Sequence, residues 1–175
     1  SGYSESESIL NEWNYVCGWS GEGWKKSLAT ELSIKGAAFI AAVATACQHE
    51  KLDMLMYYDA RINSTMNGLF RPGTLEVRKG YYPLKIWGEM LSSDGECETS
   101  CDIPDIYAVS AVKDGASVTM ITYYSDDDEA LPRTFTVELS GDVLRTVYLL
   151  DSTHDMTACE TIAPDCGSFR LTMQP

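Results

Sequence analysis

The first half of the chain carries two apolar runs of strand length, separated by a long stretch with helical periodicity. Residues 8–17 and 51–60 form the two runs, and each predicts a strand. Between them, apolar side chains recur at intervals of four from Trp24, and after Gly36 the stretch is apolar on all sides, which predicts one long helix over 22–49. Because strands buried on both faces are typical of parallel sheets, the pattern predicts a right-handed βαβ unit.

A second helix is predicted over 82–91, with Pro83 in the first turn, where a missing N–H is tolerated. Beyond this helix the apolar period changes to two, which predicts an antiparallel sandwich with turn signals such as "DG" and "SGD". The acidic run 126–129 is expected at a hairpin tip, with calcium binding as the weaker alternative. Five short strands are expected at 105–113, 117–124, 133–139, 144–151 and 168–173.

Both halves contain too few strands to be closed structures. Two parallel strands with their helices leave apolar strand faces uncovered, and five strands are few for a sandwich, so we expect a sixth or seventh from elsewhere. Either the chain self-associates through its open sheet, or it is the C-terminal end of a longer enzyme.

Charge and hydropathy exclude some classes of partner. Lys plus Arg number 13 against 26 Asp plus Glu, which gives a net charge of −13, so no basic stripe is present for binding nucleic acid. The longest apolar run, 36–47, is shorter than the roughly 20 residues of a membrane span. The chain does not open with a readable secretion signal, and its location, cytoplasmic or secreted, stays open.

The cysteines allow several states. The sequence contains a pair separated by three residues and a pair separated by six, and neither spacing is the C-x2-C pattern of zinc sites. Free thiols, disulfides and a metal site therefore all stay open. The six cysteines are Cys17, Cys47, Cys97, Cys101, Cys159 and Cys166.

Several motifs together resemble a known family. The segments "ILNEWNYV", "DMLMYYDAR", "NGLF" and "KGYYPLKIWGEML", followed by a small β domain, resemble the C-terminal part of clan A glycoside hydrolases, and family 39, the β-xylosidase-like group, in particular. The resemblance implies the C-terminal two (β/α) units of a (β/α)8 barrel, strands seven and eight, over 1–93. A linker over 94–104 and an antiparallel β-sandwich domain over 105–175 follow. A bacterial source is also implied.

The resemblance gives Glu12, near the end of the first strand, the role of the catalytic nucleophile. Retaining glycosidases of this kind need a second carboxyl group as acid/base about 5–5.5 Å away. No stretch of this chain matches the setting of that acid/base in the family. The chain alone is therefore expected to be inactive on β-glycosides such as xylosides, and no cofactor or metal is implied.

Further side chains are placed near the strand ends, where the chemistry of (β/α)8 enzymes lies. Asn14 shares the strand parity of Glu12, Trp19 lies in the following loop, and the rest lie at or beyond the end of the second strand. Competing interpretations are a structural Glu12 paired with Arg61 or a lysine, and an Asp59–Arg61 bridge. The candidate substrate-binding residues are Asn14, Trp19, Tyr58, Asp59, Arg61 and Asn67.

A second hypothesis belongs to a different class. The β domain could make this chain a non-catalytic carbohydrate-binding or structural module, because the acid/base is missing. The expected partners are an oligosaccharide or glycoside substrate and, for the open sheet, the N-terminal part of the barrel or a second copy of the chain. The sugar and the linkage are not readable from this sequence.

Overall fold

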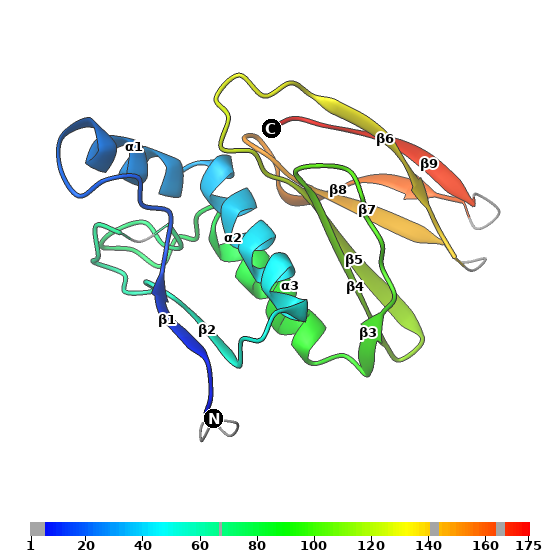
Figure 1. Ribbon diagram of the computed structural model, residues 1–175. Coiled ribbons are helices and arrows are strands. Elements are labelled where there is room, and N and C mark those ends of the chain that lie inside the picture. Colours follow the sequence, from blue (N-terminus) through cyan, green and yellow to red (C-terminus); the bar gives the residue numbers. More distant parts are fainter. Residues whose placement is uncertain (1–5, 67, 141–143, 164–166) are drawn as a thin grey trace.

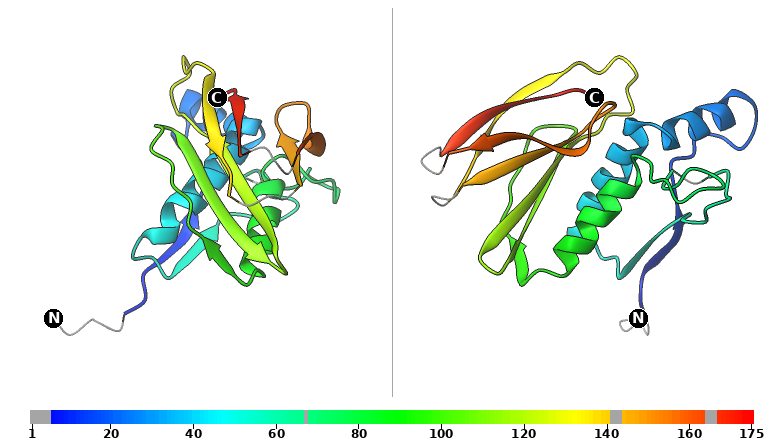
Figure 2. Two further views of the ribbon diagram at one scale, coloured as in Figure 1. Left: turned by 90° about the vertical axis from the view of Figure 1, so that its right-hand side faces the viewer. Right: turned by 180° about the vertical axis from the view of Figure 1, so that it is seen from behind.

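The computed structural model describes residues 6–66, 68–140, 144–163 and 167–175. Its helices form a layer between a parallel strand pair on one side and antiparallel sheets on the other (Figure 1). The view from behind in Figure 2 shows the same order of layers. The two halves predicted from the sequence, the parallel unit and the antiparallel strands, therefore pack together through the helices.

The parallel pair consists of β1 (Ile9–Trp13) and β2 (Met54–Tyr57). The prediction of a parallel pair is confirmed, although both strands are shorter than the apolar runs that predicted them. Helices connect the two strands, as a parallel connection requires.

The connection is two helices rather than one, so the prediction of a single long helix was wrong. α1 (Gly21–Glu31) and α2 (Ile34–Ala46) meet at a bend of 80°, and a short 3-10 turn, Cys47–His49, follows α2. Ser33 has an extended backbone at the break, and its hydroxyl donates a hydrogen bond to the carbonyl oxygen of Thr30. The extended residue ends the helical ladder even though the apolar periodicity continues across it.

Two strands lie where none was predicted. β3 (Gly95–Cys97) lies inside the predicted linker and pairs with β4 (Ile106–Lys113). β8 (Asp155–Ile162) lies between the last two predicted strands, where a loop over 152–167 was expected, and pairs with β7 (Arg145–Leu150). β3 is too short to show a period, and β8 is polar with an interrupted register, which removes the alternation. The other elements of this half are α3 (Tyr81–Leu91), β4 (Ile106–Lys113), β5 (Ala116–Tyr123), β6 (Arg133–Glu138), β7 (Arg145–Leu150) and β9 (Ser168–Met173).

The strands of the second half form three antiparallel sheets. Their orders are β3-β4-β5, β6-β9 and β7-β8. Antiparallel pairing was predicted for this half and is confirmed.

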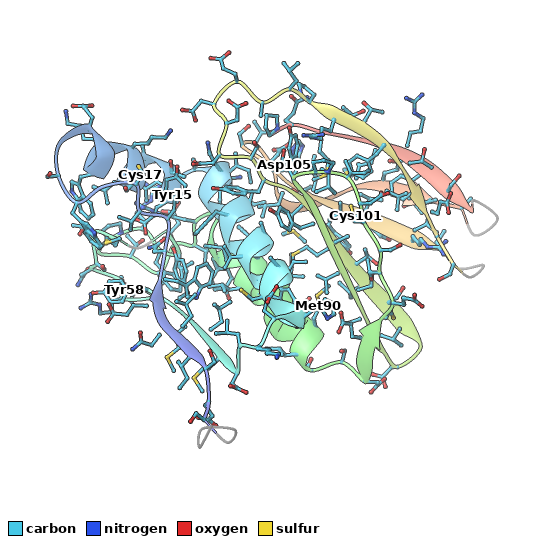
Figure 3. The ribbon with its side chains drawn as sticks, in the orientation of Figure 1. Tyr15, Cys17, Tyr58, Met90, Cys101 and Asp105 are labelled. Carbon is cyan, nitrogen blue, oxygen red and sulfur yellow. The ribbon has the colours of Figure 1, made fainter. Side chains whose placement is uncertain are left out.

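One apolar core crosses the predicted domain boundary. Ala41 of α2 and Met90 of α3 pack against Val109, Ala111 and Met120 of the β4–β5 sheet, and all five are buried. Figure 3 shows Met90 on the sheet side of the helices. Because both halves contribute to this cluster, we expect them to unfold together.

A second connection is polar and lies in the loop between β5 and β6. Asp126 accepts a hydrogen bond of 2.6 Å from the Tyr15 hydroxyl, and Asp128 forms ion pairs of 2.9 Å with Lys26 and 3.0 Å with Lys35. The prediction of a hairpin tip for the acidic run was wrong, because β5 and β6 belong to different sheets. The run instead contacts the helices and the segment that follows β1. These side chains act as ion-pair partners of lysines.

Replacing Tyr15 by Phe should weaken this connection. The ring would keep its packing against Phe39, but the hydrogen bond to Asp126 would be lost, and hydrogen bonds to charged groups contribute about 1.5–3 kcal/mol. We expect the free energy of unfolding, measured by urea denaturation, to fall by this amount. Tyr124→Phe is the control, because its hydroxyl lies 3.5 Å from the same oxygen. An equal loss in both variants would contradict the prediction.

The described residues give limited information on cysteines, metals and membranes. Five cysteines lie among them, and all five carry free thiols, whereas Cys166 lies outside. Within this part of the chain, no three His, Cys, Asp or Glu side chains are grouped as metal ligands. No single described helix is long and apolar enough to cross a membrane, and only α1 and the following helical segment, taken together across their bend, reach that length and composition.

Candidate active site

Glu12 lies near the C-terminal end of β1, at a local irregularity. Between the pairs Leu10–Leu55 and Trp13–Tyr57, β1 contains one residue more than β2, so Glu12 lies in a bulge. Bulges redirect side chains and are frequent beside active sites. The Glu12 side chain is exposed.

The two faces of the parallel pair differ in how they are covered. Trp13 is 8% exposed and packs in a cluster with Ile40 of α2. On the pair as a whole, Ile9, Met54 and Met56 are 46%, 42% and 45% exposed. One face of the pair is therefore covered by α2, and these three apolar side chains stay about half exposed on the pair.

The Glu12 side chain makes no hydrogen bond or ion pair with any residue in the described part of the chain. The Glu12–Arg61 pair that would give this carboxylate a structural role is not formed, because Arg61 instead contacts Asp59. The carboxylate thus carries no structural contact that would hold it away from a reacting molecule.

Asn14 joins the ends of the two strands. Its amide nitrogen donates to the Glu31 carboxylate and, at 2.6 Å, to the carbonyl oxygen of Tyr58, with the carbonyl oxygen of Met66 at 3.5 Å. Its amide oxygen accepts a hydrogen bond of 2.6 Å from the backbone N–H of Tyr15. Both ends of the amide are therefore engaged inside the chain.

Glu31, the last residue of α1, is a buried carboxyl group that the sequence analysis missed. Its side chain is 3% exposed, and its second oxygen, Oε2, has no hydrogen-bond partner among the described residues. Burial raises the pKa of Glu31 to about 7, the hydrogen bond from Asn14 opposes the rise, and Asp59 adds to it while Arg78 lowers it. The signal was present in the sequence, because Glu31 lies seven residues after Trp24 on the expected apolar stripe.

The buried face of α1 is consequently more polar than predicted. Ser27, Thr30 and Glu31 are buried, whereas Leu32, which belongs to the predicted stripe, is 45% exposed. Because α1 and α2 meet at a bend of 80°, the predicted apolar stripe does not continue from one helix to the next, and Leu32 at the end of α1 faces solvent.

The pKa of Glu31 predicts a specific pH dependence of stability. In the unfolded chain this carboxyl releases its proton near 4.5, whereas in the folded chain it keeps the proton to about 7. The folded state binds more protons between these values, so stability falls as the pH rises from 4.5 to 7, by about 3 kcal/mol. In Glu31→Gln this part of the pH dependence should be absent.

Urea unfolding at pH 5, 6, 7 and 8 measures the difference between the variant and the native chain. Glu22→Gln is the matched control, because Glu22 is an exposed carboxylate of the same helix. A Glu31→Gln curve parallel to that of the native chain would contradict the prediction.

The residues after β2 form a compact polar group. Arg61 donates two hydrogen bonds, of 2.7 and 2.9 Å, to one oxygen of Asp59 and a third, of 2.7 Å, to the hydroxyl of Tyr58. Burial would raise the pKa of Asp59, but hydrogen bonds from Arg61 and Ser64 outweigh it and lower the pKa. The Asp59–Arg61 bridge, one of the two interpretations left open by the sequence, is present. Asn67 lies outside the described residues.

Trp19 is presented to solvent by the loop after β1. Its side chain is 74% exposed and stacks on Trp24 of α1, with ring centroids 6.0 Å apart and planes at 23°. Stacking fixes the plane of an exposed aromatic ring, and such a ring offers an apolar face to a ligand.

The strand ends bring part of the predicted site together. Asn14 contacts Tyr58, and Asp59 and Arg61 follow directly in the chain; in Figure 3 Tyr58 lies beside β1. Within the described residues, the Glu12 carboxylate forms no hydrogen bond or ion pair with these side chains. The roles of all these residues in catalysis or substrate binding stay predictions.

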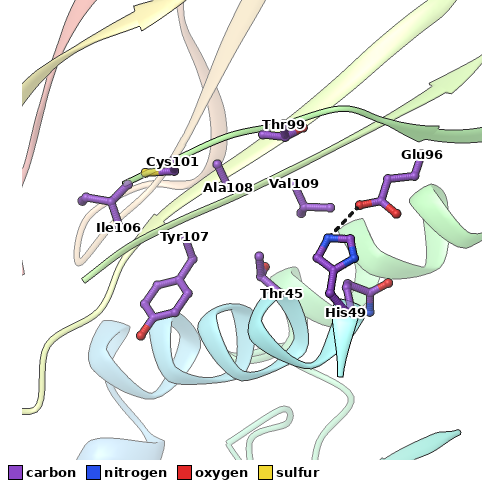
Figure 4. Close-up of a pocket in the computed structure, with 10 residues that line it drawn as sticks. Thr45, His49, Glu96, Thr99, Cys101, Ile106, Tyr107, Ala108 and Val109 are labelled. Carbon is purple, nitrogen blue, oxygen red and sulfur yellow. Dashed lines mark ion pairs between the residues drawn. The ribbon is translucent and has the colours of Figure 1, made fainter. Parts of the chain in front are cut away.

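The pocket in Figure 4 lies elsewhere. This cavity of about 180 Å³ is lined by Thr45, His49, Glu96, Cys101 and other residues, and the His49 ring lies 3.5 Å from the Glu96 carboxylate. It adjoins the C-terminal end of α2 and therefore the N-terminal end of β2. Because active sites of parallel αβ units lie at the opposite, C-terminal ends of the strands, we do not place the site here.

Comparison with known families gives no match, and no curated protein matches the chain. Solved structures do match. A family 30 endoxylanase from Clostridium papyrosolvens has a TM-score of 0.62 at 13% identity, over 95% of this chain and 39% of its own. A family 30 subfamily 8 xylanase from Clostridium acetobutylicum has a TM-score of 0.61 at 13% identity, over 95% and 40%. A glucosidase from Croceicoccus marinus has a TM-score of 0.68 at 16% identity, over 99% and 44%.

These similarities establish the fold. The matching structures are glycoside hydrolases with a TIM-barrel fold, and this chain spans about two fifths of their length. The fold of this chain thus agrees with the resemblance of its motifs to clan A glycoside hydrolases. Membership of family 39 stays a prediction.

Proposed function

We propose that this chain is the C-terminal segment of a retaining glycoside hydrolase that acts on β-glycosides such as xylosides, and that Glu12 is its nucleophile. The observation that carries the proposal is the position of Glu12: exposed, without a structural partner among the described residues, at the C-terminal end of a strand in a fold shared with glycoside hydrolases. The family 39-like motifs supply the finer assignment.

The chemistry proceeds in two displacements. The Glu12 carboxylate attacks the anomeric carbon, the bond from this carbon to the leaving oxygen breaks, and an acid protonates that oxygen. Water, deprotonated by the same acid/base group, then attacks the anomeric carbon and releases Glu12, so the product keeps the β configuration. We propose that the acid/base belongs to a barrel strand outside this chain.

The other residues of the proposed site would contact the sugar or hold those that do. Tyr58 and the Asp59–Arg61 pair would face the substrate from the end of β2, with Asn67 in the loop beyond. Trp19 would stack on a sugar ring. Asn14, whose amide is engaged inside the chain, would hold the two strand ends.

In the proposed parent protein, the half-exposed apolar face of the parallel pair would be covered. Strands from the N-terminal part of the barrel would pack on Ile9, Met54 and Met56 and remove these apolar side chains from water. Self-association is the other arrangement that would cover them, and light scattering of the isolated chain distinguishes a monomer from a symmetric oligomer.

One observation favours a second candidate function. The exposed Trp19 ring, stacked on the half-buried Trp24, would suit a carbohydrate-binding module that does not cleave its ligand. Titration of the isolated chain with xylo-oligosaccharides, followed by tryptophan fluorescence, would then show binding that Trp19→Ala removes and Glu12→Gln leaves unchanged.

The test of the main proposal is hydrolysis of a panel of aryl β-glycosides, xyloside included. The panel compares this chain with the parent polypeptide, in which the rest of the barrel precedes it. We expect the parent to cleave at least one substrate with retention, seen as the β anomer in the first product by NMR, and this chain alone to be inert. A parent that cleaves none, or that inverts configuration, would refute the proposal.

A further inference from the structure

The buried Glu31 carboxyl group has no role in the reaction as proposed above. It belongs to the outer helix α1, is 3% exposed, and so does not reach a substrate at the strand ends. Within the described residues this carboxyl forms no ion pair, and its Oε2 accepts no hydrogen bond. Burying a carboxyl in this way is costly. Such costs concentrate where a residue serves a function.

Within the described residues, the hydrogen bond that this carboxyl accepts leads toward the site. Within the described residues, Glu31 accepts from the Asn14 amide, and the same amide nitrogen donates to the carbonyl oxygen of Tyr58. An amide has two N–H donors, and these contacts use both of them. Asn14 follows Glu12 by two residues, and Tyr58 precedes Asp59. The contacts thus fasten the strand end that carries Glu12 to the strand end that carries Tyr58 and Asp59.

Backbone packing restricts Glu31 further. A Cβ atom at Gly68 would lie 2.6 Å from the Glu31 carbonyl oxygen, and one at Gly36 would lie 2.9 Å from the same oxygen. Two segments therefore contact the backbone of Glu31 closely. This packing restricts movement of the backbone that carries the carboxyl group, and so holds the carboxyl group in place beside the Asn14 amide.

We propose that Glu31 is a positioning residue for the glycosidase reaction, which orients Asn14 and through it the strand end that bears the nucleophile. The inference rests on the proposed function of Glu12. An ionised Glu31 makes a charge-assisted hydrogen bond to Asn14, which is stronger than that made by the neutral acid. Rising pH should therefore tighten the position of Asn14.

Other charged and titratable groups face the same cluster. Asp59 opposes the ionisation of Glu31, Arg78 favours it, and the Tyr57 phenol, whose pKa burial raises, stays protonated. The pKa of Asp59 lies below its usual value, so Asp59 is already charged where Glu31, with a pKa of about 7, titrates. A transition near neutral pH at Asn14 is thus assigned to Glu31.

The first arm of the test uses this chain and needs no activity. The side-chain amide signals of Asn14, identified by their loss in Asn14→Asp, are followed by NMR from pH 5 to 9. They should shift with a midpoint near 7 in the native chain and stay constant in Glu31→Gln. Constant signals in the native chain, or a shift that persists in Glu31→Gln, would overturn the proposal.

The second arm uses the parent polypeptide. Glu31→Ala should lower kcat about tenfold with little change in KM, whereas Glu31→Gln, which keeps an oxygen acceptor, should restore kcat and remove the limb near neutral pH from its pH profile. Unchanged kcat in folded Glu31→Ala would overturn the proposal. A fully active Glu12→Gln parent would instead overturn the proposed function itself, so the two failures are distinguishable.

Discussion

Glu12→Gln in the parent polypeptide should lower kcat on an aryl β-xyloside by at least about a thousandfold, because the variant has no carboxylate to form the glycosyl-enzyme. The amide is nearly isosteric, and Glu12 makes no contact with the described residues that its replacement would break, so stability should be unchanged. Steady-state kinetics together with thermal unfolding measures both. Glu50→Gln, at the exposed opposite end of the βαβ unit, is the control and should keep full activity.

A small external nucleophile separates the role of nucleophile from that of acid/base. In Glu12→Ala, azide can attack the anomeric carbon directly as the aryl leaving group departs. This single displacement gives the α-glycosyl azide. If Glu12 were instead the acid/base, another carboxylate would form the glycosyl-enzyme in Glu12→Ala, and azide would then displace it to give the β product. A β-glycosyl azide, or a Glu12→Gln variant that keeps its activity, would show that Glu12 is not the nucleophile.

Gly36→Ala should destabilise the chain by about 3 kcal/mol or more, which is the largest stability effect that we expect from a single methyl group. Its Cβ would clash with the Thr30 carbonyl oxygen and would lie 2.9 Å from the Glu31 Cα. Both are backbone atoms, so relief requires α2 to move away from the end of α1. Urea unfolding of this chain gives the free energy directly.

Gly88→Ala is the matched control for this substitution. Gly88 also lies inside a helix, α3, but a Cβ there would have no other atom within 4 Å. Alanine is the better helix former, so this variant should gain about 0.5–1 kcal/mol. A similar change in stability for the two variants would show that helix propensity, and not the contact between α1 and α2, governs Gly36.

Local patterns predicted what depends on local chemistry. Two apolar runs predicted the parallel pair, and a period of two predicted β4, β5, β6, β7 and β9. The break at Ser33 escaped prediction because the apolar period continues through it, while the bend depends on contacts with the carbonyl oxygens of α1. β8 escaped because its polar residues conceal the strand.

Some parts of the candidate site could also be predicted from the sequence, and others could not. Glu12 was assigned by the motifs that resemble glycoside hydrolases, and Asp59 by its place at the end of the second predicted strand, since the chemistry of (β/α)8 enzymes lies at strand ends. Both roles stay predictions. The Asn14–Glu31–Tyr58 contacts could not be predicted, because they join residues 17 and 44 positions apart. Glu31 was visible only as an acid on an apolar helical stripe, a signal that does not say which group it contacts.

The half-covered face of β2 makes its thioethers accessible to chemical oxidants. Met54 and Met56 are 42% and 45% exposed, whereas Met66, Met90 and Met120 are 8% exposed or less. Peroxide would convert the first pair to polar sulfoxides well before the buried three, and a sulfoxide on this face would oppose the docking of further apolar strands. Oxidative damage before assembly would therefore fall on the surface where the remainder of the barrel is proposed to join.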